Sequence, residues 1–234
     1  MSGDLAALEA RMGYAFRDRA LLERALRHPS WLQDHPGEEH NQRLEFLGDA
    51  VLQLVLTEAL CALYPADREG TLTKRRALLI SGAFLAAVAR ELGLGPCLRL
   101  GSDEEAAGGR ARDAALGDAF EAVIGAVHQD SGGAASGATV RRIFGDLPRR
   151  LEGREGAANP KGRLQEFAQP MHGNHAVRYE LVATAGADHA KEYEVAVFLL
   201  DRRLGSGRGP SKKLAEEAAA RAALAELAVP PPAP

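Results

Sequence analysis

Cysteine is scarce in this chain, whose 234 residues include only Cys61 and Cys97, without a Cys-x-x-Cys pair. This scarcity excludes a disulfide framework and gives no indication of a zinc site. Two isolated thiols fit a reducing compartment, so we expect a cytoplasmic protein.

Apolar runs as long as a membrane span are also lacking from the sequence, so we expect no membrane partner. The N-terminus carries Asp4 and Glu9 and does not have the basic and then apolar layout of a signal peptide. Basic residues are not in excess either, because the formal net charge is −3. Any nucleic-acid binding must therefore depend on local basic patches rather than on the charge of the whole protein.

What the sequence does contain is two apolar helical segments that each carry a pair of carboxylates. Glu45 and Asp49 lie four positions apart near the start of the first segment, and Asp118 and Glu121 lie three apart in the second. Residues at these spacings share one face of a helix. Apolar residues flank both pairs, and a glycine directly precedes each aspartate, which would let another backbone come close. If the two helices pack together, four carboxylates converge.

Four converging carboxylates repel one another unless a cation neutralises them. Oxygen ligands without histidine or cysteine favour a hard divalent ion, and Mg²⁺ in particular binds a few carboxylates together with phosphate oxygens. The pattern therefore indicates metal-assisted hydrolysis of a phosphodiester. The alternative is that the two acid pairs lie on solvated helix faces and bind no metal, as many acid pairs at helical spacing do.

The same two segments resemble a known family. The string Arg-Leu-Glu-Phe-Leu-Gly-Asp-Ala-Val-Leu in the first is similar to the signature of the ribonuclease III family. The string Asp-Ala-Phe-Glu-Ala-Val-Ile-Gly-Ala in the second is similar to that family's other acidic motif. The first string is long and highly specific, so it favours the enzymatic interpretation of the acid pairs.

The resemblance implies roles for individual side chains. Phe46 would be a knob that enters a pocket of the partner subunit in a homodimer, although from the residues alone it could equally be a core aromatic. Glu69 would be a supporting acid. The remaining implied roles fall on the four paired acids: Glu45, Asp118 and Glu121 hold the metal, and Asp49 and Glu121 are catalytic.

Helical periodicity and capping signals continue through residues 3–150, without convincing period-2 alternation, and predict an all-α endonuclease domain. Within it we expect a loop at 101–109, a helix that Gly132 and its neighbour break, and a further helix over 138–151. Residues 151–158 lack apolar anchors and are typical of a flexible linker.

Residues 159–228 have a different pattern, with one helix, three alternating strands and a final helix. A turn is expected at 170–174, and Val177, Tyr179 and Leu181 alternate on one side of the first strand. This α-β-β-β-α order begins with Pro-Lys-Gly-Arg-Leu-Gln-Glu, and its final helix opens with Gly-Pro-Ser-Lys-Lys-Leu-Ala-Glu. It resembles a double-stranded RNA-binding domain, so the fold class is an all-α domain followed by an α+β domain.

Such a domain recognises the A-form by contacting two successive minor grooves and the phosphates between them. The candidate contacts are Gln165, Glu166 and His189 for minor-groove hydroxyls, and Lys212 and Lys213 for phosphates at a helix N-terminus. A lysine pair there could equally be an ordinary solvated helix start. The final residues, 229–234, are proline-rich, and we expect them to be disordered.

Together the resemblances imply an endoribonuclease that makes staggered cuts in double-stranded RNA, leaves 5′-phosphate and 3′-hydroxyl ends, and processes rRNA precursors and some mRNAs. The chain departs from the family pattern at Gln42, where many members have an acid, and at Gly162, where threonine is usual. Two alternatives stay open. One is a double-stranded RNA-binding protein that does not cleave, and the other is a nuclease that uses paired histidines and the RNA 2′-hydroxyl.

Overall fold

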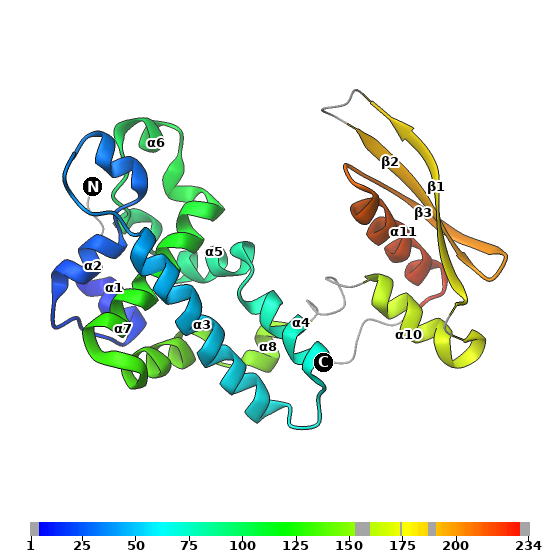
Figure 1. The fold of residues 1–234 in the computed structure, drawn as a ribbon, viewed down its shortest axis with the longest axis horizontal. Coiled ribbons are helices and arrows are strands. Elements are labelled where there is room, and N and C mark those ends of the chain that lie inside the picture. Colours follow the sequence, from blue (N-terminus) through cyan, green and yellow to red (C-terminus); the bar gives the residue numbers. More distant parts are fainter. Residues whose placement is uncertain (1–4, 153–159, 174, 187–190, 230–234) are drawn as a thin grey trace. The chain divides into compact units, whose positions relative to one another are not determined.

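The computed structural model describes residues 5–152, 160–173, 175–186 and 191–229. The chain divides into two compact units, Met1–Leu151 and Glu152–Pro234, each with its own hydrophobic core (Figure 1). The first unit is helical, as predicted. Its α-helices are α1 (Leu5–Met12), α2 (Arg19–Ala25), α3 (Gln42–Leu63), α4 (Glu69–Leu79), α5 (Gly82–Glu91), α6 (Ser102–Ala106), α7 (Asp113–Phe144) and α8 (Leu147–Leu151), and its 3-10 helices are η1 (Pro29–Gln33), η2 (Gly95–Cys97) and η3 (Gly109–Ala111).

Helices α3 and α7 form the centre of this unit, and α5 packs against α7 (Figure 1). Leu44, Leu52 and Leu56 of α3 are almost fully buried, as are Phe120 and Val123 of α7. Burial of this apolar surface is the main stabilising contribution to the unit. It also fixes the face of each helix that points inward, and therefore where the polar residues between the apolar ones emerge.

Helix α3 is also long and apolar enough to cross a membrane by length and composition alone, which the sequence analysis did not expect. Core helices of globular proteins pass the same test. In this chain α3 buries Leu44, Leu52 and Leu56 within the helical unit.

Two glycines set the distance between α3 and α7. A Cβ atom on Gly48 would lie 1.8 Å from the carbonyl oxygen of Glu121, and one on Gly125 would lie 2.0 Å from that of Leu44. No side chain fits at either position, so the two backbones touch directly. We expected Gly117, beside Asp118, to make this approach from α7. A Cβ there would meet nothing closer than 3.5 Å, and Gly125 makes the contact instead.

The end of α7 differs from the expected pattern. Gly132 interrupts the helix, as predicted, with φ 77 and ψ −177, but helical structure resumes and continues to Phe144. Gly145 then adopts a φ of 59, and only the short α8 follows. A single helix over 138–151 was therefore the wrong prediction, because Gly145 turns the backbone out of the helical region.

The segment predicted as a loop at 101–109 contains α6. The backbone amide of Ser102 donates to Oδ2 of Asp34 at 2.7 Å, and that of Gly101 donates to Oγ of Ser30 at 3.0 Å. These bonds satisfy backbone donors at the start of α6 from a distant part of the chain. Sequence patterns of the segment itself do not show such tertiary capping.

The second unit contains, in order, α10 (Pro160–His172), β1 (Val177–Ala185), β2 (Glu192–Leu199), β3 (Arg202–Gly209) and α11 (Lys212–Glu226). This is the predicted α-β-β-β-α order. The strands form an antiparallel sheet in the order β1-β2-β3, and α11 packs on β2 and β3 (Figure 1). Gly207 lies directly under α11, since a Cβ on it would be 2.2 Å from the amide nitrogen of Ala219.

Two details of this unit differ from a simple pattern, and the first corrects a prediction. The expected turn at 170–174 begins later, because Pro170 lies inside α10, where its fixed φ is compatible with helix, and Gly173 with a φ of 83 follows the helix end. Leu181 lies on the predicted side of β1 with Tyr179, because the two residues pair in the same register with Val195 and Val197, but it is 48% exposed. The register of the edge strand β1 shifts between Leu181 and Ala183, so this end of the strand leaves the core.

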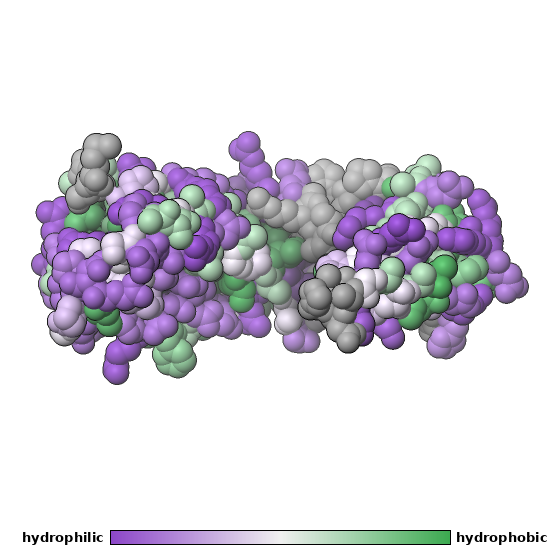
Figure 2. Space-filling model, turned by 90° about the horizontal axis from the view of Figure 1, so that it is seen from above, coloured by the Kyte–Doolittle hydropathy of each residue, from purple (hydrophilic) through white to green (hydrophobic). Residues whose placement is uncertain are grey.

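The surface of the first unit is mostly polar on the face seen in Figure 2, where apolar residues form small separate patches. A few large apolar side chains are nevertheless exposed on α3, among them Phe46 at 82% and Leu54 at 61%. Single exposed apolar residues are common, but a pair on one helix is compatible with a contact surface.

We predict that Gly48→Ala destabilises the first unit by about 3 kcal/mol, because the added methyl group must push α3 away from the Glu121 carbonyl. Chemical denaturation measures the change. The control is Gly70→Ala on α4, where a Cβ meets nothing within 4 Å, so stability should be unchanged or higher by about 0.5–1 kcal/mol. Equal stabilities of the two variants would contradict the direct backbone contact.

Candidate active site and metal centre

Three carboxylates converge where α3 crosses α7. Glu45 extends from α3, and Asp118 and Glu121 extend from α7. One oxygen of each lies within 4.8 Å of an oxygen of the other two, and all three side chains are half-buried. Gly48 and Gly125 produce this convergence, since they bring the two helix backbones into contact between the acids. Three oxygen ligands at this separation fit a hard divalent cation.

The raised pKa values of these acids agree with a site for a cation. Burial, followed by the charges of Asp49, Glu45 and Asp118, raises the pKa of Glu121 to about 7. Burial and then the charges of Asp118 and Asp49 also raise the pKa of Glu45. The protein alone therefore does not accommodate all of these negative charges easily, and a bound cation would relieve the repulsion.

Asp49, the fourth predicted acid, lies close enough to raise the pKa values of Glu45 and Glu121 but does not belong to the three-acid group. Its carboxylate instead accepts two hydrogen bonds from Nε2 of Gln53, at 2.8 and 3.0 Å. The sequence analysis predicted that four acids converge. The structure brings three ligand positions together and holds the fourth acid to one side.

A histidine that the sequence analysis missed lies beside the acids. Burial raises the pKa of Asp118, and the nearby His28 opposes this shift by lowering it. His28 precedes η1, and its Nδ1 lies 2.9 Å from Oγ of Ser30. It stands outside any periodic pattern, so nothing in the sequence marked it as a neighbour of an acid more than 80 positions away.

Two other predicted residues of the first unit lie outside the three-acid group. Glu69 is exposed in the first turn of α4, where it accepts a hydrogen bond from Oγ1 of Thr73 at 2.8 Å. Phe46 is 82% exposed on α3, so the possibility that it is a core aromatic is excluded.

The predicted RNA contacts of the second unit lie on two helices. Gln165 and Glu166 are in α10, and Lys212 and Lys213 are exposed in the first turn of α11. Ser211 caps that helix, since its side chain accepts a hydrogen bond from the amide of Leu214. His189 lies outside the described residues.

An ion pair connects the two helices that carry these residues. Lys161 of α10 pairs with Glu216 of α11, and its Nζ lies 4.7 Å from the centre of the Tyr179 ring. Burial, followed by the charge of Glu216, raises the pKa of Tyr179 to about 12. The ion pair thus joins α10 and α11 directly beside Tyr179 of β1.

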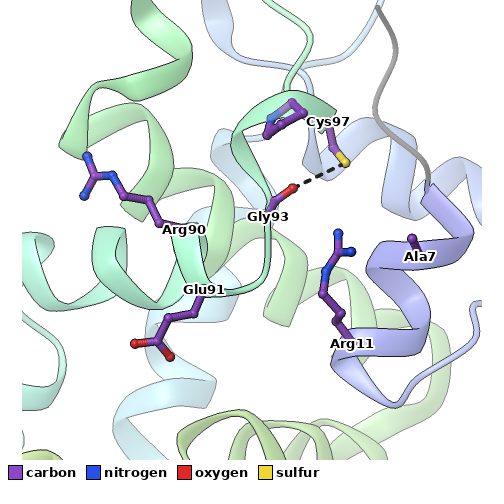
Figure 3. A pocket seen from close by; sticks show the side chains of 7 residues that line it. Ala7, Arg11, Arg90, Glu91, Gly93 and Cys97 are labelled. Atoms are coloured by element: carbon purple, nitrogen blue, oxygen red, sulfur yellow. Dashed lines mark hydrogen bonds between the residues drawn. The ribbon is translucent and has the colours of Figure 1, made fainter.

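A separate pocket of about 370 Å³ lies between α1, the end of α5 and η2 (Figure 3). Nε of Arg11 donates to the carbonyl oxygen of Leu92 at 2.5 Å, and the Cys97 thiol donates to that of Gly93 at 3.8 Å. Both donors thus satisfy carbonyls at the C-terminal end of α5. The pocket contains none of the clustered acids, and its charged lining residues Arg90 and Glu91 pair with Asp113 and Arg150.

Comparisons with known proteins agree with the geometry of the acids. The family model described as Ribonuclease-III-like matches residues 18–147, which include all of α3 and both acids of α7. The chain belongs to the ribonuclease III family. A second model, described as double-stranded RNA binding motif, matches residues 160–227 of this ribonuclease III family member.

Full-length relatives show the same relationship. The chain is 45% identical to Ribonuclease 3 of Oleidesulfovibrio alaskensis over 214 residues, which cover 90% of this chain and 92% of that protein. It is 44% identical to Ribonuclease 3 of Pelotomaculum thermopropionicum over 94% of this chain and 92% of that one. This member of the ribonuclease III family is therefore an endoribonuclease that acts on double-stranded RNA.

A solved structure supports the fold of the first unit. The nuclease domain of ribonuclease III from Campylobacter jejuni aligns with a TM-score of 0.58 and 38% identity, over 62% of this chain and 99% of that one. That protein is described as having structural flexibility in a region involved in dimer formation. The aligned 62% of this chain corresponds in length to the helical unit, which agrees with a nuclease domain confined to that unit.

We predict that Glu121→Gln stabilises the metal-free protein at about pH 8 by about 1–2 kcal/mol, a value reduced to allow for solvent screening of this half-buried group. A carboxyl whose pKa is raised on folding binds a proton in the folded state that the unfolded state has lost, so stability falls as pH rises from about 4.5 to about 7. The glutamine removes that loss. Thermal unfolding in the presence of a chelator measures the difference in stability between Glu121→Gln and the wild type.

Below about pH 4.5 the wild type and Glu121→Gln should have the same stability, because the carboxyl is then neutral in both states. Glu58→Gln, at an exposed acid of α3, serves as the control and should change the stability at about pH 8 by no more than about 0.5 kcal/mol. Identical wild-type and Glu121→Gln melting curves at about pH 8 would contradict the unfavourable environment assigned to Glu121.

Proposed function

We propose that this endoribonuclease cleaves double-stranded RNA by Mg²⁺-assisted hydrolysis at the α3–α7 crossing, giving staggered cuts with 5′-phosphate and 3′-hydroxyl ends. The observation that supports the proposal is the convergence of Glu45, Asp118 and Glu121 within 4.8 Å. Their raised pKa values indicate that the cluster favours a cation. The choice of Mg²⁺ follows from an all-oxygen ligand set beside a phosphate substrate.

In this proposal Glu45, Asp118 and Glu121 hold the metal. When bound, the ion supplies positive charge that stabilises the charge developing on the phosphate during hydrolysis. Asp49, held by Gln53 beside the cluster, and Glu121 carry the catalytic roles, which include positioning the attacking water. Glu69, exposed at the start of α4, supports the site electrostatically rather than as a ligand.

The second unit supplies affinity for the duplex. Gln165, Glu166 and His189 would contact minor-groove hydroxyls, while Lys212 and Lys213 would contact the phosphates between the grooves. The capped N-terminus of α11 supports the phosphate role, because its backbone amides and its dipole both favour anions. We assign the nuclease domain to residues 3–150, a linker to 151–158 and the RNA-binding domain to 159–228.

We further propose a two-fold homodimer, since one subunit carries one acidic site and a duplex has two strands to cut. The exposed ring of Phe46, next to Glu45 on α3, supports a contact with a partner copy at this edge of the site. Neither Cys61 nor Cys97 forms a disulfide, which agrees with a protein of the reducing cytoplasm. There the substrates would be rRNA precursors and some mRNAs, as for the family in general.

Glu121→Gln is predicted to lower the cleavage rate of long duplex RNA in Mg²⁺ by about 10³-fold or more, because the glutamine removes a charged metal ligand that also positions the attacking water. Binding to the same duplex should remain within about threefold of the wild-type affinity, since the second unit is unchanged. Gel analysis of products and filter binding of the duplex measure the two quantities.

Glu58→Gln is the matched control and should cleave as the wild type does. Cleavage by Glu121→Gln within severalfold of the wild-type rate would refute the role given to Glu121. Duplex binding without products by the wild type in Mg²⁺ would favour a protein that binds without cleaving. Products with 2′,3′-cyclic ends in excess chelator would instead support the histidine-dependent alternative.

Phe46→Glu should convert the dimer to a monomer, because it places a charge where an exposed aromatic ring would be buried on association. Sedimentation equilibrium measures the dimer dissociation constant, which should rise by about 100-fold in Phe46→Glu. Met171→Glu, at another exposed apolar residue but in the second unit, is the control and should not alter it. An unchanged dimer in Phe46→Glu would show that this face is not the interface.

A further inference from the structure

Asp49 and its partner Gln53 form a pair within α3 that separates one acid from the other three. Nε2 of Gln53 donates to both oxygens of the Asp49 carboxylate, at 2.8 and 3.0 Å. Of the acids that the structure describes here, Glu45, Asp118 and Glu121 form the ligand group, and Asp49 is not in it. We propose that Gln53 is a positioning residue that keeps the Asp49 carboxylate out of the metal-binding group, an inference that rests on the metal site proposed above.

Two forces act on Asp49 in the same direction. Its charge raises the pKa values of Glu45 and Glu121, so these acids in turn repel its carboxylate. The amide of Gln53, one helical turn further along α3, offers the carboxylate a favourable neutral partner on the side away from this repulsion. Hydrogen bonds to a charged group in a half-buried position are stronger than those between neutral groups.

The turn of α3 that carries Gln53 is itself anchored. The hydroxyl of Thr57 donates to the backbone carbonyl of Gln53 at 2.6 Å and accepts a hydrogen bond from Nη1 of Arg76 at 2.9 Å. Arg76 belongs to α4, so these bonds connect the turn to a second helix. The Gln53 side chain therefore starts from a fixed backbone position and not from a fraying helix end.

This positioning has a chemical consequence. A carboxylate that ligates a cation has its charge and lone pairs occupied, whereas one held beside the cation by an amide stays available to a water molecule or to RNA. A site of four carboxylates would also bind Mg²⁺ more tightly than a site of three, because affinity rises with the number of charged ligands. Gln53 would thus weaken metal binding while keeping Asp49 free to act on the substrate side.

The plain alternative is that Gln53 and Asp49 form an ordinary pair on a helix surface, which stabilises the helix slightly and does nothing else. In that case removal of the amide lowers the melting temperature a little and leaves Mg²⁺ affinity unchanged. The two interpretations therefore differ in a binding measurement that requires neither RNA nor cleavage.

The experiment is calorimetric titration of Mg²⁺ into the full-length protein, with Gln53→Leu compared with the wild type. Gln53→Leu should bind Mg²⁺ at least about threefold more tightly, because Asp49 can then join the other acids. The gain should vanish when Asp49→Asn is added, so that the double variant binds as Asp49→Asn alone does. Gln129→Leu is the matched control and should bind as the wild type does, since its amide oxygen accepts from Arg24 rather than contacting an acid.

Circular dichroism verifies folding, and Gln53→Asn, whose amide is too short to make the same pair, replaces Gln53→Leu if the leucine variant does not fold. A gain smaller than about threefold, a loss of affinity, or a gain that persists with Asp49→Asn would overturn the role of Gln53. Wild-type protein that binds no Mg²⁺ would overturn the proposed metal site itself, and this inference with it.

Discussion

Direct contact between the backbones of α3 and α7 is the constraint on which the active site depends. Gly48 and Gly125 each face a carbonyl oxygen of the opposite helix, at distances that leave no room for a side chain. Helices that pack through ordinary side chains lie 8–10 Å apart, about the range of most helix pairs. A closer approach of the backbones brings carboxylates on opposite helices nearer to one another. Here Glu45 and Glu121 share a half-buried space, so the packing of two glycines determines the chemistry of two acids.

The acids impose a cost that the surrounding core offsets. Burial raises the pKa values of Glu45, Asp118 and Glu121, which means that folding works against their ionisation. Leu44 and Phe120, next to these acids along the two helices, are almost fully buried and hold the crossing together. Proteins commonly retain such unfavourable groups where function needs them. Because folding disfavours ionisation of this cluster, a cation bound to the ionised acids would raise the stability of the folded protein.

Sequence patterns predicted the part of this arrangement that depends on local spacing. Helical periodicity placed Glu45 on one helix face and Asp118 and Glu121 on another, and the flanking apolar residues favoured packing of the two helices. Contacts between distant segments were not visible. His28 approaches Asp118 through a loop, and Gly125 rather than Gly117 meets α3, because both depend on the rotation and crossing of the packed helices. The position of Asp49 was missed for a different reason, since periodicity fixes a helix face but not a side-chain rotamer.

The acidity of the active site also explains why the charge of the whole chain is uninformative. A cluster of carboxylates repels the RNA backbone until a cation is present, so the nuclease unit alone is poorly suited to capture its substrate. Under the proposed function, Lys212 and Lys213 on a capped helix of the second unit supply local positive charge for that purpose. Capture and cleavage are thereby assigned to groups of opposite sign in separate units, which the formal net charge of −3 does not reveal. A near-neutral chain can for this reason act on a highly charged polymer without any excess of basic residues.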